Sequence, residues 1–442
     1  MSSASFLRVV LIASVYGFLK EFKPTEPYLY EFEHVYPIWT YAYLAFLIPV
    51  FLLTDLLLYK PVVVLEAVAY LTTWIIFDFG KSVLSQQFIE GIYGCATATE
   101  VAYYAYLYVA VEKDSYRKVT SLSRSALLAG RFCSYLISQL IILLGWGDYM
   151  MLNYITTGSL VLAVACSLAL PMISWRDAYE RRFPPENDEK SVGEPSYSLF
   201  AGRLLKTLWR DTKQIYSDSF TLKWSLWWAL ASCVDYQVQN YTQTLWGSVQ
   251  TAQTQYNGIT EAIVPFLSIP CVLLMQKVTL NWRVWGEPTL SFLSLVDAGI
   301  LLLLALTPSI FVMYGGYIAY RVLYEAMITI AQFNLASRLA KDSFGLLFGL
   351  NTFIALGLQT ILTLIVNDKK GLHLPIRTQF FVYSGLHVFI TIVFAVAGIA
   401  TFLLTARRSN RMVDQATSPV HSSLGGDSEK TLNSHEGIDR HF

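Results

Sequence analysis

Long apolar stretches follow one another along almost the whole chain, and they constrain its fold more than any other feature. A helix needs roughly 20 mainly apolar residues to cross a hydrocarbon core about 30 Å thick. Twelve stretches approach or exceed that length: 5–19, 38–58, 61–80, 87–112, 123–145, 150–173, 222–247, 258–279, 288–306, 309–337, 343–367 and 378–405. We therefore expect an all-α membrane protein with about twelve transmembrane helices, arranged as two six-helix halves.

The composition supports this class and excludes several others. Only 14% of the residues are charged, whereas soluble domains carry about a quarter, and the formal net charge of zero gives no reason to expect a nucleic-acid partner. No HExxH, GxGxxG, P-loop or GxSxG motif is present, so we predict neither an enzyme nor a cofactor. The cysteines lie in apolar stretches without a CxxC pair, so we interpret them as packing residues rather than metal ligands.

Polar segments divide the chain. Residues 174–221 interrupt the apolar pattern and predict a linker with a short amphipathic helix around Leu204–Ile215. We expect an N-terminal six-helix half at 1–173, a C-terminal half at 222–405, and a disordered tail at 406–442.

The distribution of basic residues predicts the orientation. Lys and Arg concentrate in loops that share one side of the membrane with the N-terminus: Lys113, Arg117, Lys118, Arg124, Arg176, Arg181, Arg182, Arg338, Lys341, Arg407 and Arg408. Because cytoplasmic loops carry an excess of bases, both termini and the 174–221 loop are expected in the cytoplasm. By analogy of layout, two six-helix halves resemble the major facilitator architecture, in which the substrate lies near the midplane between the halves.

Glu100 is the first candidate for ligand binding. An ionisable side chain inside a span costs several kcal/mol unless it is paired or hydrated, so it marks a functional hypothesis. Glu100 lies deep in the fourth stretch with no base within one helical turn. Its carboxylate suits a cationic substrate or a proton, and the alternative is a structural pair with a base on another helix. Tyr103, three residues later, is expected beside the same ligand, whereas Tyr104 and Tyr106 are expected to pack elsewhere.

Aromatic residues at the start of the second stretch allow two interpretations. Tyr36 and Trp39 lie one turn apart. They fit either an interfacial aromatic belt or a surface that stacks on a flat or cationic ring.

Other charged residues in the spans suggest ion pairs or ligand contacts. Arg321 and Glu325 have the i, i+4 spacing of an intrahelical pair, and either neutralise each other or act in ligand contact or gating. Asp235 in the seventh stretch either pairs with Arg131 of the fifth or adds negative potential to the cavity. Glu26 lies between prolines after the first stretch, at the outer mouth or reaching the cavity.

The sequence resembles the reduced folate carrier and thiamine transporter family from about residue 5 to 405, apart from the central loop. The segments that carry the resemblance are KPTEPYL at 23–29, YPIWTYAYL at 36–44, PVFLLTDLLLYKPV at 49–62, TATEVAYYAYLY at 97–108, WSLWWAL at 224–230, YNG at 256–258, FGLNTFIALGLQT at 348–360 and DKKGLHLP at 368–375. The resemblance implies a plasma-membrane carrier for a small water-soluble vitamin, thiamine or folate.

The charge of the site residues favours the thiamine-transporting branch. In the folate-carrying branch, the positions matching Trp39, Glu100 and Gln359 are a small polar residue, an Arg and a Lys. Here all three have the thiamine-type form, although Arg321 stands where the folate branch has a substrate-binding Arg. The resemblance implies a pocket formed by Tyr36, Trp39, Glu100 and Tyr103, with contributions from Glu26 and Asn257.

Three rival classes remain open at the level of the sequence. The first is a secondary carrier, for thiamine, folate or another vitamin-like substrate. The second is a receptor or scaffold that keeps the pocket but moves no substrate. The third is an integral membrane enzyme, which is disfavoured because no acid–base–nucleophile or metal cluster occurs in the stretches.

Overall fold

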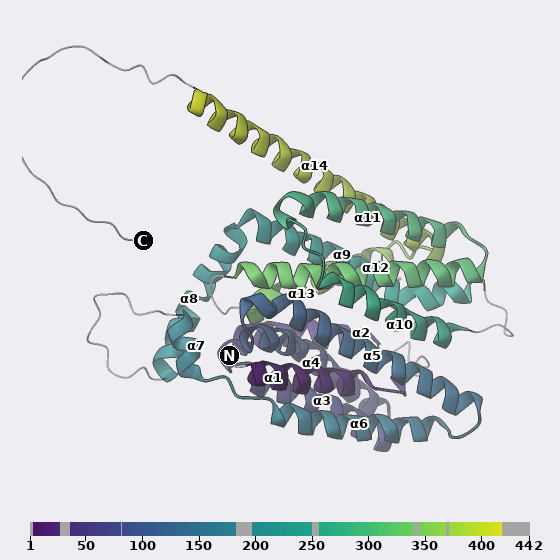
Figure 1. Ribbon diagram of the computed structural model, residues 1–442. Helices are drawn as coiled ribbons and strands as arrows, with labels where there is room; N and C mark the ends of the chain where they lie inside the picture. The colour runs from purple at the N-terminus through teal and green to yellow at the C-terminus, as the bar shows by residue number, and fades with distance from the viewer. Residues whose placement is uncertain are drawn as a thin grey trace, which may run out of the picture.

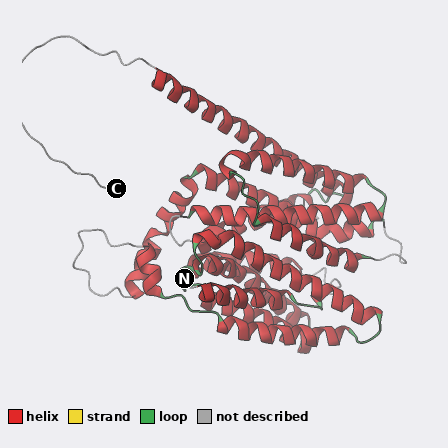
Figure 2. Ribbon diagram, in the orientation of Figure 1, coloured by secondary structure: helices red, strands yellow, loops and turns green. Residues whose placement is uncertain are grey.

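A computed structural model describes residues 3–26, 36–80, 82–182, 197–249, 256–339, 344–367 and 371–417. Within these residues the regular structure is helical throughout (Figure 2). The first group of helices is α1 (Ser3–Glu21), α2 (Tyr36–Thr54), α3 (Lys60–Phe79), α4 (Val83–Val109), α5 (Tyr116–Leu143) and α6 (Tyr149–Ala169). After α7 (Trp175–Arg182) and α8 (Tyr197–Ser217), the second group is α9 (Ser219–Gly247), α10 (Asn257–Met275), α11 (Trp282–Leu306), α12 (Ile310–Arg338), α13 (Phe344–Val366) and α14 (Ile376–Thr417).

The all-α membrane fold predicted from the sequence is confirmed. Each of the twelve predicted stretches coincides with one helix of α1–α6 or α9–α14. By length and composition, 7 helices of the described chain could each cross a membrane: α3, α5 with its preceding turn, α6, α10, α11, α13 and α14. The full count of twelve spans stays a prediction.

α2 is apolar but shorter over Tyr41–Thr54, whereas α1, α4, α9 and α12 carry polar groups that face other helices. α4, α9 and α12 contain Glu100, Asp235 and Arg321, all of which line a central cavity. α1 ends in Lys20 and Glu21, which are both buried. Lower mean hydropathy is therefore what a cavity-lining span is expected to show.

The two groups of helices lie against each other along their length (Figure 1). α1–α6 form one side of the bundle and α9–α14 the other. Contacts between the groups run through α5 with α10 and α12, and through α13 with α2 and α4. The predicted boundaries of the two halves stay a prediction, although this arrangement fits them.

One end of the bundle holds the connecting helices and the outer ends of the first and last helices. α7 and α8 lie there, together with the N-terminal end of α1 and the far end of α14 (Figure 1). α8 is longer than the predicted amphipathic segment Leu204–Ile215, and it buries Phe200 and Leu204 against Ala178. α14 continues to Thr417, past the predicted start of the tail at 406; residues 418–442 lie outside the described part, and the disorder of the tail stays a prediction.

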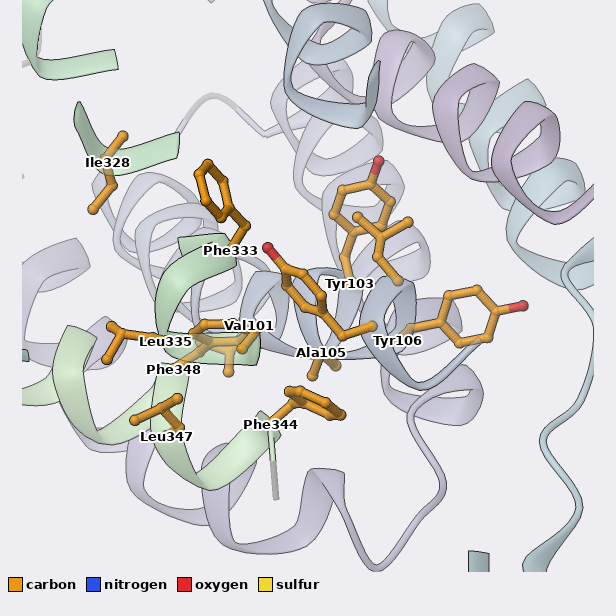
Figure 3. Close-up of a cluster of buried hydrophobic side chains, with 14 of the residues drawn as sticks. Val101, Tyr103, Ala105, Tyr106, Ile328, Phe333, Leu335, Phe344, Leu347 and Phe348 are labelled. Carbon is orange, nitrogen blue, oxygen red and sulfur yellow. The ribbon is translucent and has the colours of Figure 1, made fainter. Parts of the chain in front are cut away.

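Aromatic packing holds the two groups together near that end. The Tyr108 ring of α4 lies 5.6 Å from the Phe344 ring and 5.4 Å from the Phe348 ring, both on α13. The same hydrophobic cluster includes Tyr103 of α4 and Phe333 of α12 (Figure 3).

Candidate binding site

A cavity of about 260 Å³ lies between the two groups of helices. α2, α4 and α5 contribute its lining from one group, and α9, α12 and α13 from the other. Binding sites for drug-sized ligands measure roughly 300–1,000 Å³, so this cavity suits a small molecule. Its charged lining residues are Glu100, Arg124, Arg131, Asp235, Arg321 and Glu325.

Four of these charged residues form a chain of ion pairs. Arg124 Nη2 lies 2.6 Å from Glu325 Oε2, and Arg124 Nη1 donates to Gln332 at 2.9 Å. Glu325 Oε1 lies 3.7 Å from Arg321 Nη2, so the predicted intrahelical pair is present but long. The closer partner of Arg321 is Asp235, which accepts from Arg321 Nη1. Acids and bases alternate along this chain and neutralise one another.

The predicted pair between Asp235 and Arg131 is wrong. Arg131 Nε donates to Glu21 Oε2 of α1 at 2.6 Å, while Asp235 is held by Arg321. Gly130 explains the choice of partner, because a Cβ at this position would meet the backbone carbonyl of Phe18. The missing side chain lets α5 approach α1 closely and brings Arg131 beside Glu21.

Glu100 shares one buried base with another acid. Glu100 Oε1 lies 3.0 Å from Lys20 Nζ, and Lys20 Nζ lies 2.7 Å from Glu66 Oε1. The side chains of Lys20 and Glu66 are 0% exposed, whereas that of Glu100 is 24% exposed. The structural alternative for Glu100, a base on another helix, is therefore present, but that base has a nearer partner. Of the three groups, Glu100 is the one that lines the cavity.

The charges of the site pair off with one acid in excess. The lining groups and the residues bonded directly behind them form four base–acid pairs at 2.7 Å or less within the described chain: Arg124–Glu325, Arg131–Glu21, Arg321–Asp235 and Lys20–Glu66. Glu100 is the fifth acid. Glu261 of α10 lies outside this set: it is not among the lining residues, it accepts from the Tyr317 hydroxyl at 3.1 Å, and it is within electrostatic reach of Arg131 and Arg321.

Aromatic rings form much of the remaining wall. They are Trp39, Tyr43, Tyr104, Trp228, Tyr236, Tyr324 and Phe348. An aromatic face attracts a cation electrostatically through its ring quadrupole. Glu100 together with these rings therefore provides the chemistry that an aromatic organic cation requires.

Trp39 lies in the cavity wall rather than only at the edge of the bundle. Its indole nitrogen donates to Thr97 Oγ1 at 3.2 Å, which fixes the ring beside the turn of α4 that precedes Glu100. Gly94 makes this approach possible, since a Cβ there would lie 2.7 Å from the Ala42 side chain. The position fits the stacking interpretation of Trp39, and its contact with a ligand stays a prediction.

Tyr104, not Tyr103, lines the cavity, contrary to the expectation from the sequence. Tyr103 is fully buried, its hydroxyl donates to the Ala13 carbonyl at 3.0 Å, and its ring lies under Lys20. Both i+3 and i+4 positions share a face with Glu100, and helical spacing alone does not choose between them. The packing of α1 against this side of α4 decides the outcome, because it covers Tyr103.

The other predicted site residues lie at different distances from the cavity. Gln359 lines it. Glu26 pairs with Lys23 at 3.0 Å and accepts from the Tyr93 hydroxyl at 2.8 Å, and the Tyr93 ring packs against Trp39. Glu26 is thus connected to the wall without forming part of it.

Asn257 is the first residue of α10, and its side chain accepts from the Tyr314 hydroxyl at 2.7 Å. It is absent from the residues that line the cavity in the described part. Tyr36 begins α2, and its side chain lies outside what the structure describes.

Several lining residues escaped the sequence analysis. Trp228 and Gln239 lie seven residues before and four residues after Asp235, on the same face of α9. That spacing was a usable signal. The part played by α13 was harder to foresee, because Phe348 and Leu356 are ordinary apolar residues in a span. Among the described residues, no group of His, Cys, Asp or Glu has the arrangement of a metal site.

Comparisons with known proteins agree with this architecture. Residues 4–382 match the family described as Reduced folate carrier. Folate-like transporter 3 of Caenorhabditis elegans is 46% identical, over 88% of this chain and 95% of its own length. Human thiamine transporter 1 is 36% identical, over 91% of each chain. The crystal structure of the human organic anion transporter MFSD10 (TETRAN) covers 89% of this chain and 100% of its own, with a TM-score of 0.55 and 14% identity, a likeness of fold alone.

Proposed function

The chain belongs to the reduced folate carrier family of multi-pass membrane transporters, and we propose that it carries thiamine across the plasma membrane. The names of its relatives do not choose the vitamin. Folate transporter 1 of Caenorhabditis elegans is 36% identical to this chain, the same value as human thiamine transporter 1. The choice between thiamine and folate therefore rests on the chemistry of the cavity.

The excess carboxylate of Glu100 is the observation that carries the proposal. Thiamine is a cation with two flat rings, so it requires an acid and aromatic surfaces. Glu100 has the most exposed carboxylate of the Lys20 cluster, and Trp39 and Tyr104 lie in the same wall. In a site of low dielectric constant, such a contact is worth more than at a protein surface.

Folate is the second candidate, and the observation in its favour is the presence of three arginines in the lining. Folates are anions and need bases that can turn toward them. Arg124, Arg131 and Arg321 are each within ion-pair distance of a carboxylate, and binding an anion there would leave buried acids without partners.

Transport requires that the two groups of helices open alternately around the cavity. In this conformation, hydrogen bonds between the two groups of helices close the end of the bundle near α7 and α8. Lys113 Nζ donates to the Leu339 carbonyl at 3.0 Å, and the Gly345 amide donates to Asp55 at 3.1 Å. With the proposed orientation, in which both termini are cytoplasmic, this is the cytoplasmic end. Residues 1–173 and 222–405 would then act as the two moving halves, joined by the 174–221 linker.

Uptake of radiolabelled thiamine and folate, measured side by side in cells expressing this chain, tests the proposal. We expect saturable thiamine uptake that excess folate does not inhibit. Uptake of folate without thiamine would overturn the choice of substrate. Specific thiamine binding without flux into vesicles would instead identify a receptor.

A further inference from the structure

A buried cluster behind the cavity contains an acid to which neither the ion-pair chain nor the lining assigns a role. Glu66 of α3 accepts from Lys20 Nζ at 2.7 Å with one carboxylate oxygen and from the Tyr16 hydroxyl at 2.9 Å with the other. The Tyr103 ring lies 4.7 Å from the same Lys20 nitrogen. Glu66 is completely buried and is not among the residues that line the cavity.

We propose that Glu66 is a positioning and specificity-determining residue, which holds the Lys20 ammonium so that the Glu100 carboxylate keeps its negative charge for a cationic substrate. This inference rests on the proposed function. The residue acts through Lys20 and does not itself contact the substrate.

Geometry and charge both support this role. Lys20 Nζ lies 0.3 Å closer to Glu66 than to Glu100, at 2.7 Å against 3.0 Å. Glu66 is held in place by Tyr16, whereas the Glu100 side chain reaches the cavity. A buried ammonium needs a carboxylate partner, because an unpaired buried charge costs several kcal/mol. With Glu66 present, Lys20 keeps its partner when a substrate cation takes over Glu100.

Without Glu66, the pairing of charges in this cluster changes. Lys20 would have Glu100 as its one carboxylate partner among the described residues, and the two would form a neutral pair. A substrate cation would then have to compete with an ammonium already bound to its own acid. Because the excess acid of the cavity would be lost, binding of a cation would weaken even though the lining stays the same.

Four proteins test the inference: wild type, Glu66→Gln, Lys20→Met combined with Glu66→Gln, and Asp78→Asn. The first substitution leaves Lys20 paired with Glu100, so no buried charge is orphaned. The double variant removes a buried base and a buried acid together, a change that is often tolerated. Asp78→Asn is the matched control, because Asp78 also lies on α3 but accepts from Asn153 and Thr157 of α6. The apparent KM and Vmax for radiolabelled thiamine are measured per surface protein.

We expect Glu66→Gln to raise the KM for thiamine about tenfold, with Vmax per surface protein within about twofold of wild type. The double variant should return KM to within about threefold of wild type, because Glu100 again has no competing base. Asp78→Asn should leave KM unchanged. A merely structural role of Glu66 would instead lower surface expression or Vmax, and deleting Lys20 as well would not restore the KM.

An unchanged KM in Glu66→Gln, or a raised KM that persists in the double variant, would overturn the inference while leaving thiamine transport established. Absence of thiamine uptake by the wild type would overturn the proposed function, and this inference with it.

Discussion

Arg124 on α5 and Glu325 on α12 join the two groups of helices through a buried ion pair, with 2.6 Å between Nη2 and Oε2. Glu325 also faces Arg321, which is bound in turn to Asp235 on α9. One continuous chain of charges thus connects α5, α12 and α9 across the cavity. Each member depends on its neighbours, since removing one partner of a buried pair leaves the other uncompensated.

The Arg124–Glu325 pair gives the first prediction. Arg124→Gln should cost about 3–5 kcal/mol of stability, because Glu325 loses its nearest base in a buried setting. Adding Glu325→Gln should recover much of that loss, since Arg321 retains Asp235. The melting temperature of the purified protein in detergent measures both effects. Equal melting temperatures for wild type and Arg124→Gln would show that the pair does not stabilise this conformation.

Arg321 gives the second prediction, which concerns its choice of partner. Arg321→Gln orphans Asp235, so combining it with Asp235→Asn should restore surface expression. Combining it with Glu325→Gln should not, because Asp235 and Arg124 would then both lack an oppositely charged partner and keep only Gln239 and Gln332. If surface expression recovered with Glu325→Gln and not with Asp235→Asn, Glu325 rather than Asp235 would be the main partner of Arg321. Surface biotinylation of the three variants separates these outcomes.

The two neighbouring tyrosines of α4 give the third prediction. Tyr104→Leu removes a ring from the cavity wall and should raise the KM for thiamine by roughly twofold to thirtyfold, as expected for about 0.5–2 kcal/mol of cation–π attraction. Tyr103→Phe removes only the hydrogen bond to the Ala13 carbonyl, so it should cost about 1 kcal/mol of stability and leave KM unchanged. If Tyr103→Phe raised the KM and Tyr104→Leu did not, Tyr103 rather than Tyr104 would be the residue beside the ligand, as the sequence predicted.

The same pair of residues shows what the sequence determines. The apolar stretches were sufficient to predict α1–α6 and α9–α14, since each predicted stretch coincides with one of these helices. Which face of α4 meets the cavity depends on how α1 packs against it, and Gly17 contributes, because a Cβ there would lie 2.7 Å from the Tyr103 hydroxyl. Such contacts join residues far apart in the sequence, and no local pattern encodes them.

The sequence also did not predict which residues form ion pairs with one another. Glu100, Asp235, Arg321 and Glu325 were found because a charge in a span stands out. Their partners were not, because each base had several acids within possible reach. Arg131 pairs with Glu21 rather than Asp235 because α5 approaches α1 closely at Gly130. Only the structure shows this approach. Lys20 lies just beyond the first predicted stretch, whereas Glu66 lies inside the stretch 61–80 and was missed although it is also a charge in a span.

The fourth prediction concerns topology. An epitope tag inserted between 183 and 196, and another placed after residue 442, should react with antibody only after the plasma membrane is permeabilised. The reason is that α7, α8 and the far end of α14 lie at one end of the bundle, where the basic residues also concentrate. Labelling of either tag in intact cells would contradict the orientation and exchange the inner and outer mouths.

The last prediction tests the substrate through Glu100. Glu100→Gln keeps the shape of the side chain and removes its charge, so a cationic substrate loses a charge-assisted contact worth about 2–5 kcal/mol. That corresponds to roughly 30-fold to several-thousand-fold weaker binding, and thiamine uptake should nearly disappear. Trp39→Ala, which loses stacking rather than a charge, should cost less, about 1–2 kcal/mol.

Folate is the built-in control, because an anion should respond in the opposite direction. If this chain carried folate, Glu100→Gln would leave its uptake unchanged or increase it, since the nearby bases would face less competition from acids. Each variant is therefore assayed with both vitamins and normalised to surface protein. Normal thiamine uptake by Glu100→Gln would show that the charge of Glu100, the one acid in excess in the cavity, has no part in binding.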